Sequence, residues 1–320
     1  MSRIVIGVDI SKLKFDATIL FENNKIKQRK FDNTHSGFKD FIKWIKLNKG
    51  EEAHICMEAT GVYGDALATF LYDSGITVSM VNPLQIKGFA QSMLSRNKTD
   101  QTDATLIAHF CRAMQPKTWQ PAPEHVRVLQ ALVRRLEALE SMNRQELNRL
   151  GVAPEHIKCS IEAVIKKISE EIKLIKNKIK DHITKNPDLN DKSKLLQSIP
   201  GVGPATIMQV LAFIGDPSLF DNAKKLSAFV GLNPKQNQSG TSINGRTRLS
   251  KMGNANLRKA FYMPAVVALR YNPIIKAFSE RLKASGKMMM VIIGAAMRKL
   301  LHIIYGVLKS GKPFTLELVK

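Results

Sequence analysis

Four acidic residues in the first third of the chain have the types and the spacing of a divalent-metal site. Asp9 ends the first β-branched run, IVIGVDI, and Glu58 ends a second apolar run, AHICMEA. Asp100 and Asp103 are three residues apart at the start of a helical pattern, so both project from one helix face. Oxygen-only ligands favour Mg²⁺ or Mn²⁺ over zinc. Two such ions about 4 Å apart can hold the attacking and leaving oxygens of a phosphodiester.

Each of these acids alone has a simpler explanation. Asp100 and Asp103 favour a helix N-terminus electrostatically, and Asp9 can satisfy a turn. However, a carboxylate in a core strand is costly unless it is paired or holds a metal. The four together, in this order of strands and helix, therefore favour the metal site.

The segment NQSGTSINGRTRLSKMGNANLR contains a candidate nucleophile, Ser239, in the dipeptide Ser239-Gly240. It lies in a stretch, 231–245, whose Gly, Asn, Ser and Pro content predicts a flexible loop. A hydroxyl among phosphate-binding cations can attack phosphorus while the charge stabilises the transition state. Most loop serines are solvated turn formers, and Ser242 and Ser250 compete for the role, so the pattern alone does not single out Ser239. The cations that follow are Arg246, Arg248, Lys251 and Arg258.

A third candidate is the segment LLQSIPGVGPATIMQVLAF at 195–213, in which two apolar helices flank a glycine-containing turn. Gly201 and Gly203 allow a backbone to approach a phosphate, and the amides of the second helix then face the anion. This pattern is typical of helix-hairpin-helix motifs that bind nucleic acid without sequence preference. An ordinary tight turn between helices is the alternative, because GxG alone is weakly specific.

The elements that must position these residues follow from the hydrophobic periodicity. The first hundred residues predict a mixed sheet with helices on its faces. The expected strands are 4–8, 15–21, 25–31, 53–59 and 76–81, the expected helices are 35–48, 62–73 and 100–114, and a Pro-punctuated linker spans 115–123.

Two long amphipathic helices, 124–150 and 157–182, follow around the break GVAP at 151–154. Their leucine and isoleucine stripes predict a coiled-coil hairpin. The isoleucine seam is either an oligomer contact or packing within the chain, and the pattern does not decide between them. We therefore expect an α/β domain at 1–123, the hairpin at 124–190 and a mostly α-helical domain at 191–320.

The charge indicates a polyanionic partner. The chain has 49 Lys and Arg against 27 Asp and Glu, a net charge of +22. Residues 124–320 hold 33 basic and 15 acidic side chains, whereas residues 1–123 hold 16 and 12. Such a surplus usually means nucleic acid.

Cysteine usage and hydropathy exclude several other classes. Cys56, Cys111 and Cys159 lie far apart with no CxxC, which excludes a zinc site of the usual spacing and argues against a disulfide scaffold. No signal peptide is evident, and the longest apolar stretch, 288–297, is too short to span a bilayer. A soluble, cytoplasmic protein is expected.

The motif series resembles one known family across nearly the whole chain. The order Asp9, Glu58, Asp100-x-x-Asp103, PGVGP (200–204), GLNP (231–234), Ser239-Gly240 and KxGNxxLR (251–258) is similar to that of the DEDD transposases of bacterial insertion sequences. This is the IS one-ten family, which includes the Piv DNA invertase.

The resemblance implies a RuvC-like domain of RNase H fold, a coiled coil and a carboxy-terminal transposase domain. It implies that Asp9, Glu58, Asp100 and Asp103 bind Mg²⁺ and that Ser239 forms a covalent phosphoserine with the DNA 5′ end. It also implies a non-coding bridge RNA that pairs with donor and target DNA, and a dimer or tetramer with active sites shared between protomers. The cations would then serve largely as contacts to RNA backbone.

Three other functions are compatible with part of this pattern. A RuvC-like nuclease or Holliday junction resolvase would attack with metal-activated water, which explains the acids but leaves 231–258 unused. A non-catalytic helix-hairpin-helix binder would bind without cleaving, and the intact set of four acids argues against it. A sugar-kinase or actin-type ATPase ranks last, because no later glycine-rich phosphate loops follow.

Overall fold

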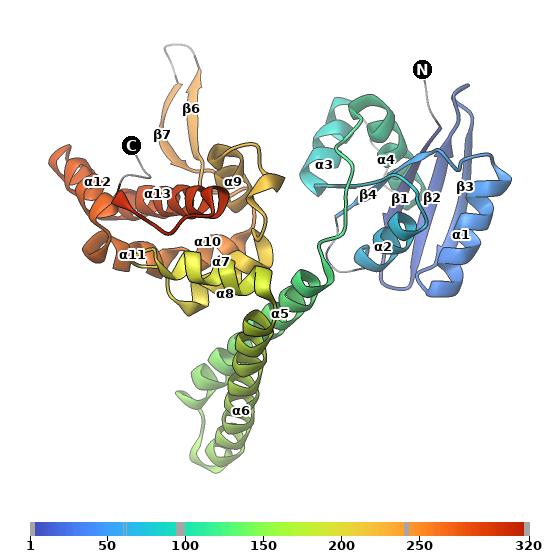
Figure 1. Ribbon diagram of the computed structural model, residues 1–320. Coiled ribbons are helices and arrows are strands. Elements are labelled where there is room, and N and C mark those ends of the chain that lie inside the picture. The colour runs from blue at the N-terminus through green and yellow to red at the C-terminus, as the bar shows by residue number, and fades with distance from the viewer. Residues whose placement is uncertain (1–3, 60, 62, 94–99, 240–242, 317–320) are drawn as a thin grey trace. The chain divides into compact units, whose positions relative to one another are not determined.

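The computed structural model describes residues 4–59, 61, 63–93, 100–239 and 243–316. The chain divides into two compact units, residues 1–122 and residues 123–320 (Figure 1). The first unit is α/β and the second is mostly helical.

The amino-terminal unit is built on a five-stranded mixed sheet with the order β3-β2-β1-β4-β5. The first three strands along the chain pair antiparallel, and β1, β4 and β5 are parallel. The strands are β1 (Val5–Ile10), β2 (Lys14–Leu20), β3 (Ile26–Asp32), β4 (His54–Glu58) and β5 (Val78–Val81). The helices are α1 (His35–Leu47), α2 (Asp65–Asp73), α3 (Pro83–Ser92) and α4 (Asp100–Met114).

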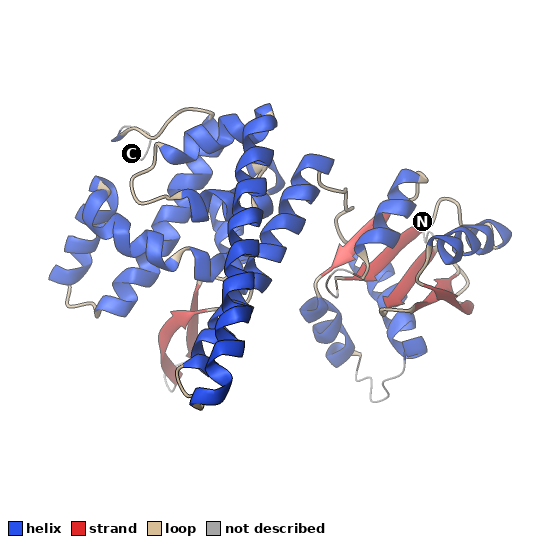
Figure 2. Cartoon of the chain, turned by 90° about the horizontal axis from the view of Figure 1, so that it is seen from below, coloured by secondary structure: helices blue, strands red, loops and turns tan. Residues whose placement is uncertain are grey.

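Helices cover both faces of this sheet (Figure 2). On one face, Ile6 and Val8 of β1 pack with the aromatic side chains of α1 and with α2. On the other, Val5 and Cys56 pack with α4 and α3. Alternate residues of each strand point to opposite faces, so Gly7 and Asp9 share the α4 face with Val5.

The expected mixed sheet is confirmed, and the expected helix 100–114 coincides with α4. The helix expected from Val62 starts in the structure at Asp65, and Val62 itself lies outside the described residues. Helix α3 was not expected from the sequence. It buries only Ile86, so it carries almost no apolar period, although Asn82 caps it and Pro83 begins it.

The second unit contains nine described α-helices, a 3₁₀ turn and one β-hairpin. Its core runs from the long helices α5 and α6 through to α13 as one cluster. The long helices are α5 (Glu124–Leu150) and α6 (Glu155–Lys185). The remainder are α7 (Pro187–Gln197), α8 (Pro204–Phe213), η1 (Pro217–Leu219), α9 (Ala223–Val230), α10 (Ala255–Ala260), α11 (Tyr262–Tyr271), α12 (Pro273–Ala284) and α13 (Met289–Ser310).

The isoleucine stripe of α6 packs within its own chain. Ile168, Ile175 and Ile179 are buried in the same cluster as the leucines of α5, while Ile161 and Ile165 nearer the hairpin tip are half-buried. The chain's own packing therefore uses much of the seam, which favours the intrachain interpretation of that stripe.

The segment 231–245, expected to be a loop, contains most of a two-stranded hairpin instead. Strands β6 (Pro234–Ser239) and β7 (Ile243–Leu249) pair antiparallel, with a register shift between Lys235 and Asn237. The exposed residues at 234–236 need no apolar alternation, because the backbone pairing alone defines the ribbon. A polar hairpin of this kind lacks the period-2 hydrophobic signal on which strand prediction depends.

The last helix, α13, is long and apolar enough to cross a membrane by length and composition alone. However, 67% of its apolar window is buried within the protein, which is the environment of a core helix. The apolar run at 288–297 is therefore the start of a longer apolar helix, exposed at 288–291 and buried in the second unit from Ile292 onward.

Candidate active site

Asp9 and Glu58 lie side by side at the ends of two parallel strands. The register places Val8 opposite Met57, so Asp9 and Glu58 occupy the next positions of β1 and β4. Both side chains are half-buried and both have interactions with neighbouring groups. Because paired residues of parallel strands point to the same face, both lie on the face that α4 covers.

Helix α4 runs antiparallel to β1 and delivers its first turn to these carboxylates. Near its far end, the Cys111 Sγ donates to the His54 carbonyl oxygen at 3.6 Å. In its middle, a Cβ on Gly7 would lie 2.1 Å from the Ala104 oxygen and 2.3 Å from the Ala108 nitrogen. From Gly7 to Asp9 is about 6.6 Å along the strand, which equals four to five helical residues at about 1.5 Å each. Residues 100–103 therefore lie beside Asp9.

Hydrogen bonds to the sheet fix the rotation of α4 about its axis. The Thr105 Oγ1 lies 3.2 Å from the Thr18 Oγ1, and the Gln28 Nε2 donates to Thr105 at 2.8 Å. Further along, the Arg112 Nη2 donates to the Leu20 carbonyl oxygen at 2.7 Å. Asp103, which precedes Thr105 by two residues on the same helix, is half-buried.

The structure also places a fifth acid beside Asp9, which the sequence reasoning missed. Asp16 of β2 is directly opposite Asp9, is 5% exposed and pairs with the Lys30 Nζ at 3.6 Å. A polar residue inside the buried run FDATILF was the available signal. The ammonium of Lys30 offsets part of the negative charge that Asp9 and Asp16 concentrate here.

The four predicted acids lie in one region, where β1 and β4 end and α4 begins. The carboxylates that the structure describes do not come close enough together to form one compact group. Asp9, Glu58 and Asp103 do not form a group of three whose oxygens all lie within 4.8 Å of one another. The side chain of Asp100 lies outside the described part of the structure. What the structure supports is a shared location for the four residues at strand ends and helix start.

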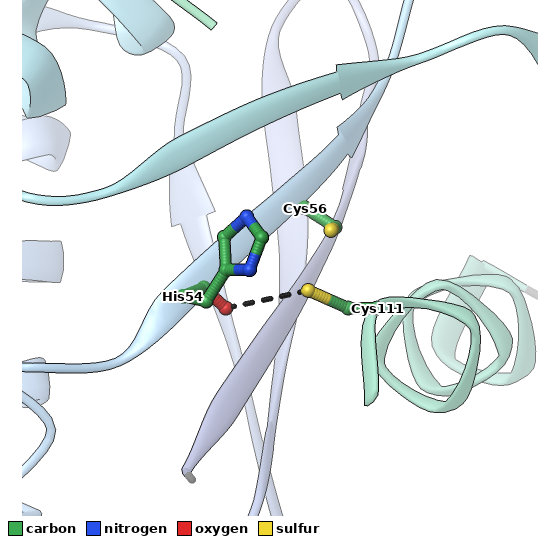
Figure 3. A group of neighbouring side chains, drawn as sticks. All are labelled: His54, Cys56 and Cys111. Atoms are coloured by element: carbon green, nitrogen blue, oxygen red, sulfur yellow. Dashed lines mark hydrogen bonds between the residues drawn. The ribbon is translucent and has the colours of Figure 1, made fainter. Parts of the chain in front are cut away.

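Among the described residues, the group that does converge is His54, Cys56 and Cys111, whose ligand atoms all lie within 4.8 Å of one another (Figure 3). The thiols of Cys56 and Cys111 share a hydrogen bond that lowers the pKa of Cys111 to about 6 and raises the pKa of Cys56. The exclusion of a zinc site of the usual sequence spacing does not apply to this group, because the fold brings together two cysteines that lie far apart in sequence.

Ser239 is the last residue of β6, opposite Ile243 at the tip of the hairpin. Gly240 and Ser242 lie outside the described residues, as do the side chains of Ser239 and Arg246. The competing Ser250 is half-buried, and its amide donates to the Asn233 carbonyl at 2.8 Å.

The other cations predicted to bind nucleic acid differ in their surroundings. Arg248 and Lys251 are exposed. In contrast, the Arg258 Nη1 donates to the backbone oxygens of Val230 at 3.2 Å and Lys251 at 3.1 Å. Arg258 thus holds the turn after α9, and any contact of its remaining donors with nucleic acid stays a prediction.

The two glycines of the 200–204 motif have different roles. Gly201 has a φ of +98°, and a Cβ there would lie 2.8 Å from the Ala268 Cβ, so this glycine is required for packing against α11. Gly203 caps α8, and a Cβ there would meet nothing within 4 Å. Only Gly203 therefore has the open backbone that the approach of a phosphate requires.

Both glycines line a groove of about 1040 Å³ between α5, α8, α10 and α11. Its basic side chains are Arg134, Arg144 and Lys259. It is also lined by two acids, Glu137 and Glu140. Glu137 accepts from the Gln209 Nε2 at 2.8 Å and the Asn256 Nδ2 at 2.9 Å, and Glu140 pairs with the Lys176 Nζ at 3.1 Å. The groove thus combines a helix N-terminus with three cations and two acids that are already engaged by protein groups.

Comparison with known proteins identifies the family. The profile of the DEDD transposases of the IS110 type matches residues 6–153, and that of the IS116/IS110/IS902 transposase family matches residues 193–280. The pilin gene-inverting protein of Moraxella bovis is 36% identical over 318 residues, which is 98% of each chain. The chain belongs to the IS110 family of transposases. The transposase for insertion sequence element IS1111A from Coxiella burnetii is 24% identical over 302 residues, 83% of this chain and 78% of its own.

Membership confirms the resemblance drawn from the motif order and makes the chain an enzyme of DNA strand cleavage and transfer. The first profile spans all four acids, and the second spans the turn of Gly201 and Gly203 and the hairpin of Ser239. Membership in this family implies DNA as the substrate and suggests a divalent metal as cofactor.

Proposed function

We propose that the chain is a bridge-RNA-guided recombinase of an insertion sequence that cleaves and rejoins DNA in the cytoplasm through a covalent phosphoserine. The observation that carries this proposal is the placement of Asp9 and Glu58 on adjacent parallel strand ends, under the first turn of α4. These are the positions from which one face of a sheet can present acids to a phosphodiester.

The fold of the first unit supports the assignment to the RuvC-like domains of RNase H fold. Three antiparallel strands followed by two parallel crossovers, in the order 3-2-1-4-5, form the scaffold expected of that fold. The acids then come from the central strand, its parallel neighbour and the helix that packs on both. The helical second unit would be the carboxy-terminal transposase domain, with α7, the Gly201–Gly203 turn and α8 as its helix-hairpin-helix motif.

The donor set at the tetrad fits a hard divalent cation. Asp9, Glu58, Asp100 and Asp103 offer only carboxylate oxygens, which Mg²⁺ and Mn²⁺ prefer. Asp9 and Asp16 also concentrate negative charge at a site where Lys30 is the cation that the structure pairs with Asp16. When bound, such an ion polarises the phosphoryl oxygens and neutralises charge that develops on them.

The proposed role of Ser239 is nucleophilic. Its hydroxyl oxygen bonds to phosphorus, the bond from phosphorus to the 3′ oxygen breaks, and the serine is left joined to the DNA 5′ end with a free 3′ hydroxyl. A 3′ hydroxyl of the exchanged strand then attacks the phosphoserine and releases the serine. The hairpin tip supports this role, because a residue there can reach a substrate that the body of the unit binds.

The second unit supplies the proposed grip on bridge RNA. The 33 basic side chains of residues 124–320, against 15 acidic ones, favour a phosphate backbone. We expect the groove lined by Gly203, Arg134, Arg144 and Lys259 to hold part of that backbone. The RNA affinity of the full chain should fall steeply as salt rises, because phosphate contacts release counterions.

The experiment that tests the proposal uses full-length chain, the bridge RNA encoded beside its gene and a labelled DNA containing the element's junction. Wild-type protein should yield a covalent protein–DNA adduct that survives denaturation. Ser239→Ala should bind the RNA normally and form no adduct, whereas Ser250→Ala, the matched control, should retain it. Asp9→Asn should also lose the adduct while keeping RNA affinity.

The outcomes separate the alternatives. Cleavage that is complete in Ser239→Ala would establish a nuclease that uses water, and tight binding with no cleavage by wild-type protein at any divalent ion would establish a binder. A DNA-bearing phosphopeptide mapped to a residue other than Ser239 would refute the serine assignment and leave the recombinase class intact.

A further inference from the structure

A second set of side chains lies between β4 and α4, further along both elements from the candidate active site. The proposed DNA chemistry does not use them. The set consists of His54 and Cys56 on β4 and Cys111 on α4. His54 and Cys56 are two residues apart on one strand, so both project toward α4. Cys56 and Cys111 are fully buried at 0% and 1% exposure, whereas His54 is half-buried.

We propose that His54, Cys56 and Cys111 form a binding site for a thiophilic divalent cation, with Zn²⁺ as the ion that fits best. Two thiols and one imidazole are the soft and borderline ligands that zinc prefers, in contrast to the carboxylates at the strand ends. On binding, each thiol loses its proton to solvent and each sulfur donates a lone pair to the metal. This inference does not depend on the proposed recombination chemistry.

The separations fit a tetrahedral ion. With zinc–sulfur bonds of about 2.3 Å and zinc–nitrogen bonds of about 2.0 Å, two ligands of one zinc lie roughly 3.5–3.8 Å apart. The Nδ1 or Nε2 of His54 and the two Sγ atoms already lie within 4.8 Å of one another. Side-chain rotations that move the ligand atoms by about 1 Å would therefore bring them to zinc-binding separations, and neither the strand nor the helix has to move.

The surroundings orient the imidazole for this role. The His54 Nε2 lies 2.7 Å from the Ser79 Oγ, which donates its one hydrogen to the backbone oxygens of Pro116 at 3.1 Å or Lys117 at 2.8 Å. Since that hydrogen is engaged, the serine oxygen accepts from an Nε2–H, and the lone pair of the neutral ring lies on Nδ1. Figure 3 shows the imidazole and both sulfur atoms turned toward one another. An acceptor that takes the second ring N–H of a ligating histidine and so fixes its tautomer is a common feature of metal sites, and the Ser79 hydroxyl occupies that place here.

Three protein ligands leave a fourth position for a water molecule, and His54 is the one ligand of the three that is only half-buried. The bound ion would join β4 to α4, two residues before Glu58 and eight residues after Asp103 in sequence. Its expected role is therefore to hold in place the two elements that carry three of the acids.

The test uses reduced, full-length chain and the metals alone. After incubation with Zn²⁺ and removal of excess ion, we expect one zinc per chain, protection of Cys56 and Cys111 from alkylation, and a higher thermal midpoint. Cys159, which is exposed on α6, should stay reactive. Co²⁺ should give the intense absorption of tetrahedral thiolate coordination.

Matched variants make the assignment falsifiable. Cys56→Ser and Cys111→Ser should each lower zinc content at least tenfold, and Cys159→Ser should leave it unchanged. His54→Gln, at a half-buried position, keeps the assay interpretable if a buried cysteine variant fails to fold. No zinc uptake by wild-type protein, zinc retained in both buried-cysteine variants, or a Cys56–Cys111 disulfide in place of metal would each overturn the proposal.

Discussion

Asp9 and Asp16 occupy directly opposed positions on the antiparallel strands β1 and β2, and Asp16 is 5% exposed. Two carboxylates on one face of a sheet repel unless a cation offsets them. Lys30, which pairs with Asp16 at 3.6 Å, supplies that charge from the neighbouring strand β3. The acids of the strand ends are thus part of a charge balance that extends across three strands.

Replacing Lys30 alone should therefore destabilise the fold more than replacing Lys30 and Asp16 together. Lys30→Met leaves the Asp16 carboxylate buried beside Asp9 without its cation, at an expected cost of about 1 kcal/mol, because the half-exposed ammonium is partly screened by solvent. In Lys30→Met with Asp16→Asn, much of that loss should be recovered. Urea unfolding of the two single variants and the double variant gives the coupling energy, and a coupling near zero would show that the ion pair is unimportant.

The close approach of α4 to the sheet depends on Gly7. In Gly7→Ala, the added methyl would lie 2.1 Å from the Ala104 oxygen, so α4 must move away from β1. We expect a loss of about 1–3 kcal/mol and loss of DNA cleavage, because Asp103 moves with the helix.

Gly88→Ala is the matched control for this substitution. Gly88 lies inside α3, and a Cβ there meets nothing within 4 Å. The alanine should stabilise the protein by about 0.5–1 kcal/mol and leave cleavage unchanged. Equal thermal midpoints for the Gly7 and Gly88 variants would contradict the steric argument.

Alanine substitution should have different effects on stability and RNA affinity at the two glycines of the 200–204 motif. Gly201→Ala combines a positive φ with a 2.8 Å contact to Ala268, so we expect destabilisation by more than about 1 kcal/mol. Gly203→Ala has open space and should fold normally, yet its methyl would occupy part of the space through which a phosphate approaches the α8 N-terminus. RNA affinity measured by filter binding should then fall in Gly203→Ala at unchanged stability. Unchanged affinity would remove the α8 N-terminus from the RNA interface.

Stability should fall in mildly acidic solution through His302. Burial, with the nearby cations of Arg298, Lys299 and Lys224, lowers the pKa of His302 in the folded protein, where its Nε2 lies 2.9 Å from the Ser227 Oγ. Below pH of about 6.5 the unfolded chain therefore binds a proton that the folded chain does not yet bind, and stability decreases as the pH falls toward the folded-state pKa.

The measurement for His302 is the difference between variants across pH. In His302→Gln, the free energy of unfolding should depend less on pH between about 7 and 5 than in wild-type protein. His156→Gln, at an exposed position of α6, should keep the wild-type slope. Identical slopes for all three chains would exclude His302 as the source.

The sequence predicts the parts of this molecule that depend on local periodicity. Asp9 and Glu58 end apolar runs that can only be buried strands, and Asp100 begins a helix whose bounds the apolar pattern defines. Their common location then follows from the rule that parallel strands end at one edge of a sheet. Topology was sufficient here because the acids occur at element ends.

Features that depend on contacts between residues far apart in sequence were missed, because local periodicity carries no information about them. Asp16 becomes relevant only through its register with Asp9, and Cys56 meets Cys111 only because Gly7 admits α4. Rules on cysteine spacing consider neighbours in sequence, so they overlooked a pair joined by tertiary packing. The hairpin of Ser239 was also missed, since its polar strands lack any hydrophobic alternation.

The last prediction concerns how the acids of the first unit meet the serine of the second. Asp9 and Ser239 belong to different compact units, and two long helices, α5 and α6, separate them in the chain. A site can therefore form within one chain or from the acids of one protomer and the serine of another. We predict the shared site, since it would allow the serine to attack only after assembly on nucleic acid.

The test mixes Asp9→Asn chains with Ser239→Ala chains, each inactive alone, and assays cleavage of single strands. With shared sites, a mixed dimer holds one site with both intact halves, so cleavage returns. With sites confined to one chain, every site lacks one half, and a mixture that stays inactive after verified exchange of chains would refute the shared arrangement.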